Sequence, residues 1–117
     1  MRPPTRCHLW QADVLQSQDL RGIFEVVETF EDTSHFSRCL LRCTRCGQRY
    51  FYQFYETIDW EDGDDPQYST YIPVDANEEV EILKKASVLE LGQFAPRLVK
   101  DYPKGAKQPN VFWVGKE

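Results

Sequence analysis

A chain of 117 residues with 41% hydrophobic and 28% charged side chains has the composition of a globular protein, and we expect one domain over residues 1–117. This composition excludes an intrinsically disordered chain, and no apolar run approaches the ~20 residues of a membrane-spanning helix. The net charge is −5, and an acidic middle between near-neutral and basic ends argues against nonspecific binding of nucleic acid by the whole surface.

The N-terminal residues 1–8 carry positive charge, but no apolar segment follows them as it would in a secretory signal. We therefore expect a cytoplasmic protein whose four cysteines are reduced. We also expect no membrane partner.

The first third of the chain predicts an irregular arm followed by a hairpin. Pro3 and Pro4 prevent a helix at the N-terminus, and residues 9–20 fit either a helix or irregular structure. Residues 23–30 and 36–43 are rich in β-branched and aromatic side chains, and polar turn residues separate them. They predict two antiparallel strands, although the apolar spacing of the first segment also suits a helix.

The middle of the chain predicts two further strands. Residues 49–60 carry aromatic side chains on both faces and suit a central strand. Asp62-Gly63 marks a turn, and residues 68–74 form the next strand. With the first hairpin, these segments predict a four-stranded antiparallel meander.

Two helix-start signatures follow the predicted meander. Asp75 and Glu78 match a capping box before apolar residues at helical spacing. Ser87 and Glu90 repeat the signature, so we expect a second short helix that ends near Gly92.

The chain ends with a proline, a turn and a short apolar segment. Pro96 can open one more helical turn, which would carry Leu98 and Val99. Residues 111–114 predict a final strand. The predicted fold class is α+β: an antiparallel β-meander with a zinc-knuckle hairpin, followed by short C-terminal helices and a final strand.

The strongest motif is Cys43-Thr44-Arg45-Cys46-Gly47, which lies between two predicted strands. Gly47 permits the tight turn that directs both thiolates at one ion, and this spacing is typical of half a tetrahedral metal site. The motif resembles one knuckle of a zinc ribbon, over about residues 40–50. The resemblance implies zinc as the cofactor. A full ribbon has a second Cys-x-x-Cys, and this chain offers Cys7-His8 in its place.

The remaining ligands are less well defined by the sequence. Cys7 is the best third ligand, because the arm has no core pattern of its own. His8, Cys39 and His35 compete for the fourth place, but four residues of strand put Cys39 ~13 Å from Cys43, which favours a core position. His35 is expected at the far end of its strand from the knuckle. The predicted metal ligands are Cys7, His8, Cys43 and Cys46, and free structural thiols or a redox Cys-x-x-Cys are the alternatives.

An acidic segment follows the longest predicted strand. Residues 50–81 hold ten acidic and no basic side chains. This segment predicts either a solvated loop, with Trp60 anchoring its base, or a binding surface for a basic protein. The predicted partner-binding residues are Asp59, Trp60, Glu61, Asp62, Asp64 and Asp65.

The leading hypothesis is a small zinc-stabilised protein that binds another protein through this acidic hairpin. An immunity or inhibitor role against a basic partner would suit such a protein. The first alternative is a nucleic-acid or transcription accessory module, because basic and aromatic residues alternate near the knuckle. The basic residues concerned are Arg38, Arg42, Arg45 and Arg49. The second alternative is an enzyme of unknown chemistry. We expect no enzyme, because neither histidine lies near a recognisable nucleophile motif.

Overall fold

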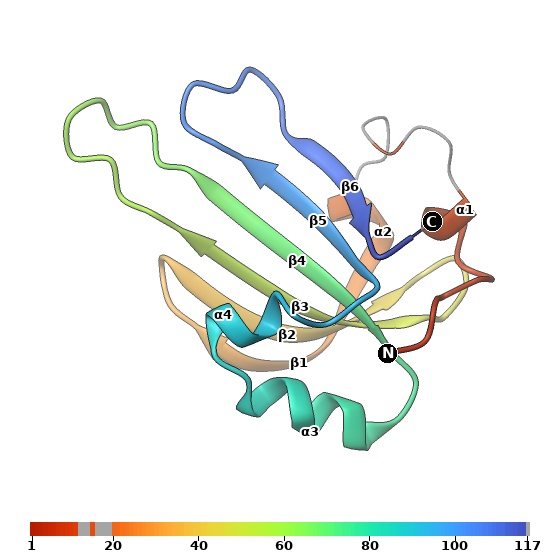
Figure 1. Cartoon of the computed structure of the whole chain (residues 1–117). Helices are drawn as coiled ribbons and strands as arrows, with labels where there is room; N and C mark the ends of the chain where they lie inside the picture. Colours follow the sequence, from red (N-terminus) through yellow and green to blue (C-terminus); the bar gives the residue numbers. More distant parts are fainter. Residues whose placement is uncertain (12–14, 16–19, 117) are drawn as a thin grey trace.

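Six strands, each paired with its neighbours in sequence, form one antiparallel sheet in the order β1-β2-β3-β4-β5-β6 (Figure 1). The computed structural model describes residues 1–11, 15 and 20–116. The strands are β1 (Phe24–Asp32), β2 (Phe36–Cys43), β3 (Arg49–Glu56), β4 (Gln67–Val74), β5 (Arg97–Tyr102) and β6 (Asn110–Val114). The predicted α+β class and antiparallel meander are therefore confirmed.

The helices of the described residues are short. They are α1 (His8–Gln11), α2 (Leu20–Ile23), α3 (Asn77–Lys85) and α4 (Val88–Leu91). Residue 14, part of the possible helical face in residues 9–20, lies outside the described residues. Among the helices of the described residues, none has the length and apolar character needed to cross a membrane.

Both predicted helix starts are present, and one is shifted by a residue. At α4 the Ser87 hydroxyl accepts a hydrogen bond from the Glu90 N–H at 3.1 Å, and the Glu90 carboxylate accepts one from the Ser87 N–H at 3.2 Å. At α3 it is Glu79, not Glu78, whose carboxylate accepts the N–H groups of Asp75 and Ala76. The Asp75 carboxylate instead pairs with Arg2 at 2.9 Å, which leaves Ala76 as the residue before the helix.

Two predictions about strands were wrong. Residues 97–102 form strand β5 instead of a helical turn, because they pair with both β4 and β6. The sheet thus has six strands: the four of the predicted meander, the unpredicted β5, and β6 where the final strand was predicted. Strand β3 ends at Glu56 instead of residue 60, since the Thr57 N–H donates to the Pro66 carbonyl at 3.0 Å and begins the loop there.

The sheet is covered on both faces, and successive residues of β2 and β4 are accordingly buried. We call the two sides the arm face, which packs against the N-terminal segment, and the helix face, which packs against α3 and α4 (Figure 1). Residues buried on the arm face are Cys7, Leu9, Leu20, Ile23, Cys39, Leu41, Cys43, Tyr50, Tyr71, Leu98 and Val111. Residues buried on the helix face are Leu40, Phe51, Ile72, Val74, Val80, Leu83, Ala86 and Leu91.

A buried cation connects the sheet to α3. Arg38 is 5% exposed, and its Nε and Nη2 donate to Oε1 of Gln53 at 2.9 and 2.7 Å. Its Nη1 donates to the carbonyl oxygens of Leu83 and Lys84 at 3.5 and 3.4 Å. These carbonyls belong to the last turn of α3, where the helix dipole is negative, so the guanidinium stabilises the docked helix.

Candidate metal centre

The β2–β3 turn holds Cys43 in a fixed position at the end of the sheet. The Cys43 N–H donates to the Gln48 carbonyl, and the Gly47 N–H donates to the Cys43 carbonyl, both at 2.8 Å. Gly47 has a φ of +80°, which a side chain would strain. The N–H and hydroxyl of Thr44 both donate to the Ile23 carbonyl, so the turn is also tied to the end of α2.

The N-terminal arm is placed over this turn by α1 and by strand β6. The Cys7 carbonyl accepts the N–H groups of Trp10 and Gln11, which forms the single turn of α1. The indole N–H of Trp113 donates to the Leu9 carbonyl at 3.0 Å, and the rings of Trp10 and Trp113 meet edge to face at 4.9 Å. These contacts bring Cys7 and His8 over the arm face beside Cys43.

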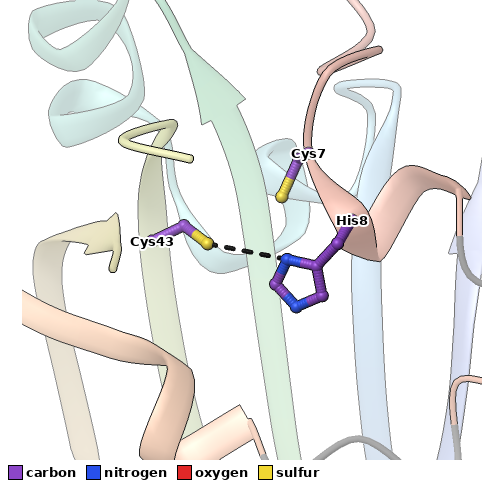
Figure 2. Close-up of side chains that lie close together, drawn as sticks. All are labelled: Cys7, His8 and Cys43. Carbon is purple, nitrogen blue, oxygen red and sulfur yellow. Dashed lines mark hydrogen bonds between the residues drawn. The ribbon is translucent and has the colours of Figure 1, made fainter. Parts of the chain in front are cut away.

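Cys7, His8 and Cys43 converge on one point (Figure 2). Their ligand atoms all lie within 4.8 Å of one another, and Sγ of Cys43 is 3.9 Å from Nδ1 of His8. In a tetrahedral zinc site the corresponding sulfur–nitrogen separation is about 3.6 Å, given Zn–S and Zn–N bonds of ~2.3 and ~2.05 Å. This group of three side chains could therefore hold a metal ion.

Burial sets the protonation of these ligands. Cys7 and Cys43 are 1% and 0% exposed, and burial raises the pKa of the Cys7 thiol to about 12. Burial also lowers the pKa of His8, and the positive charge of Arg45 lowers it further. The imidazole is therefore neutral at pH 7 and can donate a lone pair, whereas the thiols would release protons when a metal binds.

Two buried polar atoms in this region lack a well-formed hydrogen bond among the described residues. They are Nε2 of His8 and the hydroxyl of Tyr50, which lies beside the Cys7 thiol. Such groups are costly to bury without a partner, and they cluster at functional sites. The sequence did not single out Tyr50, although strand alternation places it on the same face as Cys43. That shared face is the signal that could have found it.

Cys46 lies next to this group of three and not inside it. Its side chain is exposed on the turn, but it interacts with the Cys7 thiol, and both residues line a surface cavity of about 290 Å³. The structure thus brings three of the four predicted ligands together and places the fourth beside Cys7. All four cysteines of the chain are free thiols.

The other two residues considered as ligands lie elsewhere. Cys39 is 8% exposed in the core of the arm face, and burial raises its pKa to about 11. His35 lies at the opposite end of β2, where its Nδ1 is 2.8 Å from Oε1 of Glu56.

The acidic β3–β4 loop is folded onto itself. Asp59 Oδ1 accepts the N–H groups of Glu61 and Asp62 at 3.2 and 3.3 Å. Asp65 Oδ1 accepts the Asp59 N–H at 2.7 Å. Trp60 is 87% exposed, so the prediction that it anchors the base of the loop is wrong. The aspartates hold the loop, and the indole projects from it.

This loop is also tied to the neighbouring β5–β6 loop. Nζ of Lys104 lies 3.1 Å from Asp59 and 3.0 Å from Asp62. The Gly105 N–H donates to Oδ2 of Asp64 at 2.7 Å. The hydrogen bond from Lys104 lowers the pKa of Asp59. Part of the negative charge is therefore compensated within the chain.

Three of the four arginines near the knuckle make contacts within the chain. Arg38 is buried, as described above, and Arg42 forms an ion pair with Glu25. Arg49 donates to the Asn77 side chain at 3.1 Å and to the Asp75 carbonyl at 2.8 Å. Arg38 thus belongs to the core, whereas Arg42 and Arg49 make contacts at the surface.

Comparisons with protein families, curated proteins and solved structures find no match for this chain. The zinc-ribbon resemblance of residues 40–50 therefore stays a prediction. Function is inferred below from the side chains alone.

Proposed function

We propose that the protein is a zinc-stabilised binding protein in which one zinc ion joins the N-terminal arm to the β2–β3 turn. The observation that supports this most is that two separate segments converge on one buried point. Cys7 and His8 come from the arm, and Cys43 lies 35 positions after His8. Two thiolates and an imidazole are donors that zinc prefers.

Cys46 is our proposed fourth ligand. It belongs to the same tight turn as Cys43, and its side chain already interacts with Cys7. Four protein ligands would make a closed structural site, whereas a water in the fourth position would make an open site of the kind found in zinc enzymes. The proposal therefore favours a structural zinc.

Elemental analysis of protein purified without chelator tests the metal. We expect one zinc per chain in the wild type, and well below one in the Cys43→Ser variant. The matched control is Cys39→Ser, because Cys39 lies on the same strand and face but outside the cluster. Wild-type protein without zinc, or equal zinc in both variants, would refute the proposed site.

Cobalt substitution tests the fourth ligand. Tetrahedral cobalt bound by thiolates gives visible and near-ultraviolet absorption that depends on the number of sulfur ligands. We expect Cys46→Ser to weaken the thiolate-to-cobalt bands while leaving a bound ion. An unchanged spectrum would remove Cys46 from the site and leave Cys7, His8 and Cys43 as the proposed ligands.

The binding half of the proposal concerns the acidic loop. An exposed Trp60 surrounded by carboxylates fits a basic protein partner that offers an apolar pocket, and tryptophan is enriched among residues that dominate binding energy. The loop is held in shape by its own hydrogen bonds, so binding would cost little ordering entropy. Inhibition or immunity against such a partner is the role we propose.

Crosslinking followed by affinity purification from the native host would test this surface. We expect Trp60→Ala to lose the partner. Glu61→Gln should slow capture at low salt, and its difference from wild type should shrink as salt rises, because salt screens the exposed charges that steer association. Leu89→Ala is the matched control, since Leu89 is also 87% exposed but lies on α4. Equal capture by the Trp60 and Leu89 variants would show that the loop only aids solubility.

A further inference from the structure

A second cavity lies on the arm face of the sheet, over β3, β4 and β5. Its volume is about 270 Å³, close to the lower end of the ~300–1,000 Å³ typical of ligand pockets. The lining residues are Tyr52, Phe54, Gln67, Ser69, Tyr71, Lys100, Tyr102 and Pro109. They come from β3, β4, β5 and the end of the β5–β6 loop.

Aromatic rings form much of this cavity. Tyr52 and Tyr71 are paired across β3 and β4, and their ring centroids are 4.9 Å apart. Phe54 follows Tyr52 on the same face, opposite Ser69. The Tyr102 hydroxyl donates to the Lys107 carbonyl at 3.2 Å, which fixes the β5–β6 loop at the rim. Tyr71 is 6% exposed and its ring already stacks on Phe24 at 5.3 Å, so a ligand ring would meet the half-buried rings of Tyr52, Phe54 and Tyr102. Aromatic side chains on a sheet bind bases through their faces.

Polar groups in the cavity are few and neutral, apart from one cation. Ser69 is 8% exposed, with its Oγ 3.3 Å from the Tyr52 hydroxyl. Lys100 is half-buried opposite Ser69 and is the only charged residue among those that line the cavity. Among the described residues no ion pair of Lys100 is present, although the chain carries a net charge of −5.

Among the residues that the structure describes, two carboxylates near this cavity are directed away from Lys100. Glu56 lies at its edge, where it accepts a hydrogen bond from Gln67 at 3.2 Å and pairs with His35. Asp101 alternates with Lys100 along β5 and so lies on the helix face. The half-buried ammonium of Lys100 is therefore free to compensate an anionic group that enters with a ring.

We propose that this cavity binds a nucleotide, with the base among the aromatic rings and a phosphate on Lys100. The amide of Gln67 and the hydroxyl of Ser69 supply hydrogen bonds for the polar edge of a base. The small volume fits one base and not a run of stacked bases. This site is separate from the zinc centre and does not depend on it.

Calorimetric titration of the zinc-loaded wild type with AMP, UMP, adenosine and inorganic phosphate tests the proposal. We expect both nucleotides to bind. Adenosine should bind at least about tenfold more weakly than AMP, since it lacks the phosphate that would accept a charge-assisted hydrogen bond from Lys100. Amide chemical shifts in NMR spectra should change for Ser69 and Lys100 and stay constant for Cys43. No binding of either nucleotide, or equal binding of phosphate alone, would overturn it.

A free nucleotide and a single-stranded nucleic acid would both offer a base and a phosphate to this cavity. An oligothymidylate of eight nucleotides distinguishes them. Tighter binding of the oligonucleotide than of UMP, with the same shifted amides, would identify single-stranded nucleic acid as the ligand. Tighter binding of the mononucleotide would identify a free nucleotide. Oligonucleotide binding that shifts other amides, with no mononucleotide binding, would overturn the site.

Substitutions locate the phosphate. We expect Lys100→Met to weaken AMP binding by about tenfold or more and to leave adenosine binding unchanged, whereas Lys100→Arg retains AMP. Lys107→Met is the matched control, because this exposed lysine lies in the adjoining loop outside the cavity. Equal AMP affinity for the two methionine variants would contradict the role of Lys100, and the arginine variant decides the case if Lys100→Met does not fold.

Discussion

The two faces of the sheet are covered in different ways. On the helix face, α3 and α4 have defined caps and bury Val80, Leu83 and Leu91. On the arm face, α1 and α2 are single turns of four residues each, too short to be stable alone. Helix α4 is as short, but it follows the nine-residue α3 and begins with a capping box. The comparison teaches that apolar packing suffices where a helix is regular, whereas an irregular cover needs specific anchors. The Cys7, His8 and Cys43 cluster lies where such an anchor is needed.

The largest effect should come from removing the proposed metal. We expect Cys43→Ser to lower the free energy of unfolding by several kcal/mol, because metal binding and folding of a small site are coupled. Limited proteolysis should then cut the N-terminal arm first. Chemical denaturation of wild type with and without chelator checks this, and a wild type that is indifferent to chelator would contradict it.

On the helix face, a cavity should destabilise the fold without touching the metal. Leu83 is 0% exposed, and we expect Leu83→Ala to cost about 2–5 kcal/mol. Its neighbour Ile82 is 52% exposed, so Ile82→Ala should stay within about 0.5 kcal/mol of wild type. Zinc content should be equal in both variants. Loss of zinc in the Leu83 variant would show that the two faces are not independent.

A smaller effect should follow from removing the buried cation. We expect Arg38→Met to lower stability by about 1.5–3 kcal/mol, because Gln53 and the last carbonyls of α3 lose a charged donor. Adding Gln53→Leu should recover part of this loss, since no buried amide is then left without a partner. Thermal denaturation of the single and double variants measures the difference. A double variant less stable than both single variants would refute the pairing.

The smallest effect concerns the link between the β3–β4 and β5–β6 loops. Lys104 lowers the pKa of Asp59, so this contact stabilises the fold above the ordinary pKa of an aspartate. The contribution is lost as pH falls through the lowered pKa. The difference in melting temperature between wild type and Asp59→Asn should therefore shrink below about pH 4, and comparing the two proteins cancels effects of acid on the metal ligands. A difference that is constant with pH would show that Lys104 and Asp59 are not coupled.

Strand positions and faces were largely predictable from the sequence. One face of a strand repeats every two residues, so alternation along residues 36–43 places Cys39, Leu41 and Cys43 on one face and Leu40 on the other, as the two core clusters have them. Strand β5 was missed because Pro96 suggested a helix start, and the pairing that makes residues 97–102 a strand comes from β4 and β6. The residues of this segment alone do not indicate which distant strands it pairs with.

The metal cluster shows a similar limit. The Cys-x-x-Cys-Gly turn indicated where a site begins, and the unpatterned arm indicated where Cys7 could come from. The orientation of Cys43 toward His8, with Cys46 at the surface, depends on how the arm crosses the face. That crossing is set by Trp10 and Trp113, at opposite ends of the chain.

The contact between Leu9 and Trp113 joins residues 104 positions apart, whereas each strand pairs only with its sequence neighbours. During synthesis, hairpins β1 to β4 can therefore form as the chain leaves the ribosome, because their contacts are local. The arm must wait for β6, which is synthesised after the other five strands. Until then the β2–β3 turn presents Cys43 and Cys46 without Cys7 and His8 fixed over them. We expect the nascent chain to acquire tight zinc binding only after β6 has been synthesised and has paired with the arm.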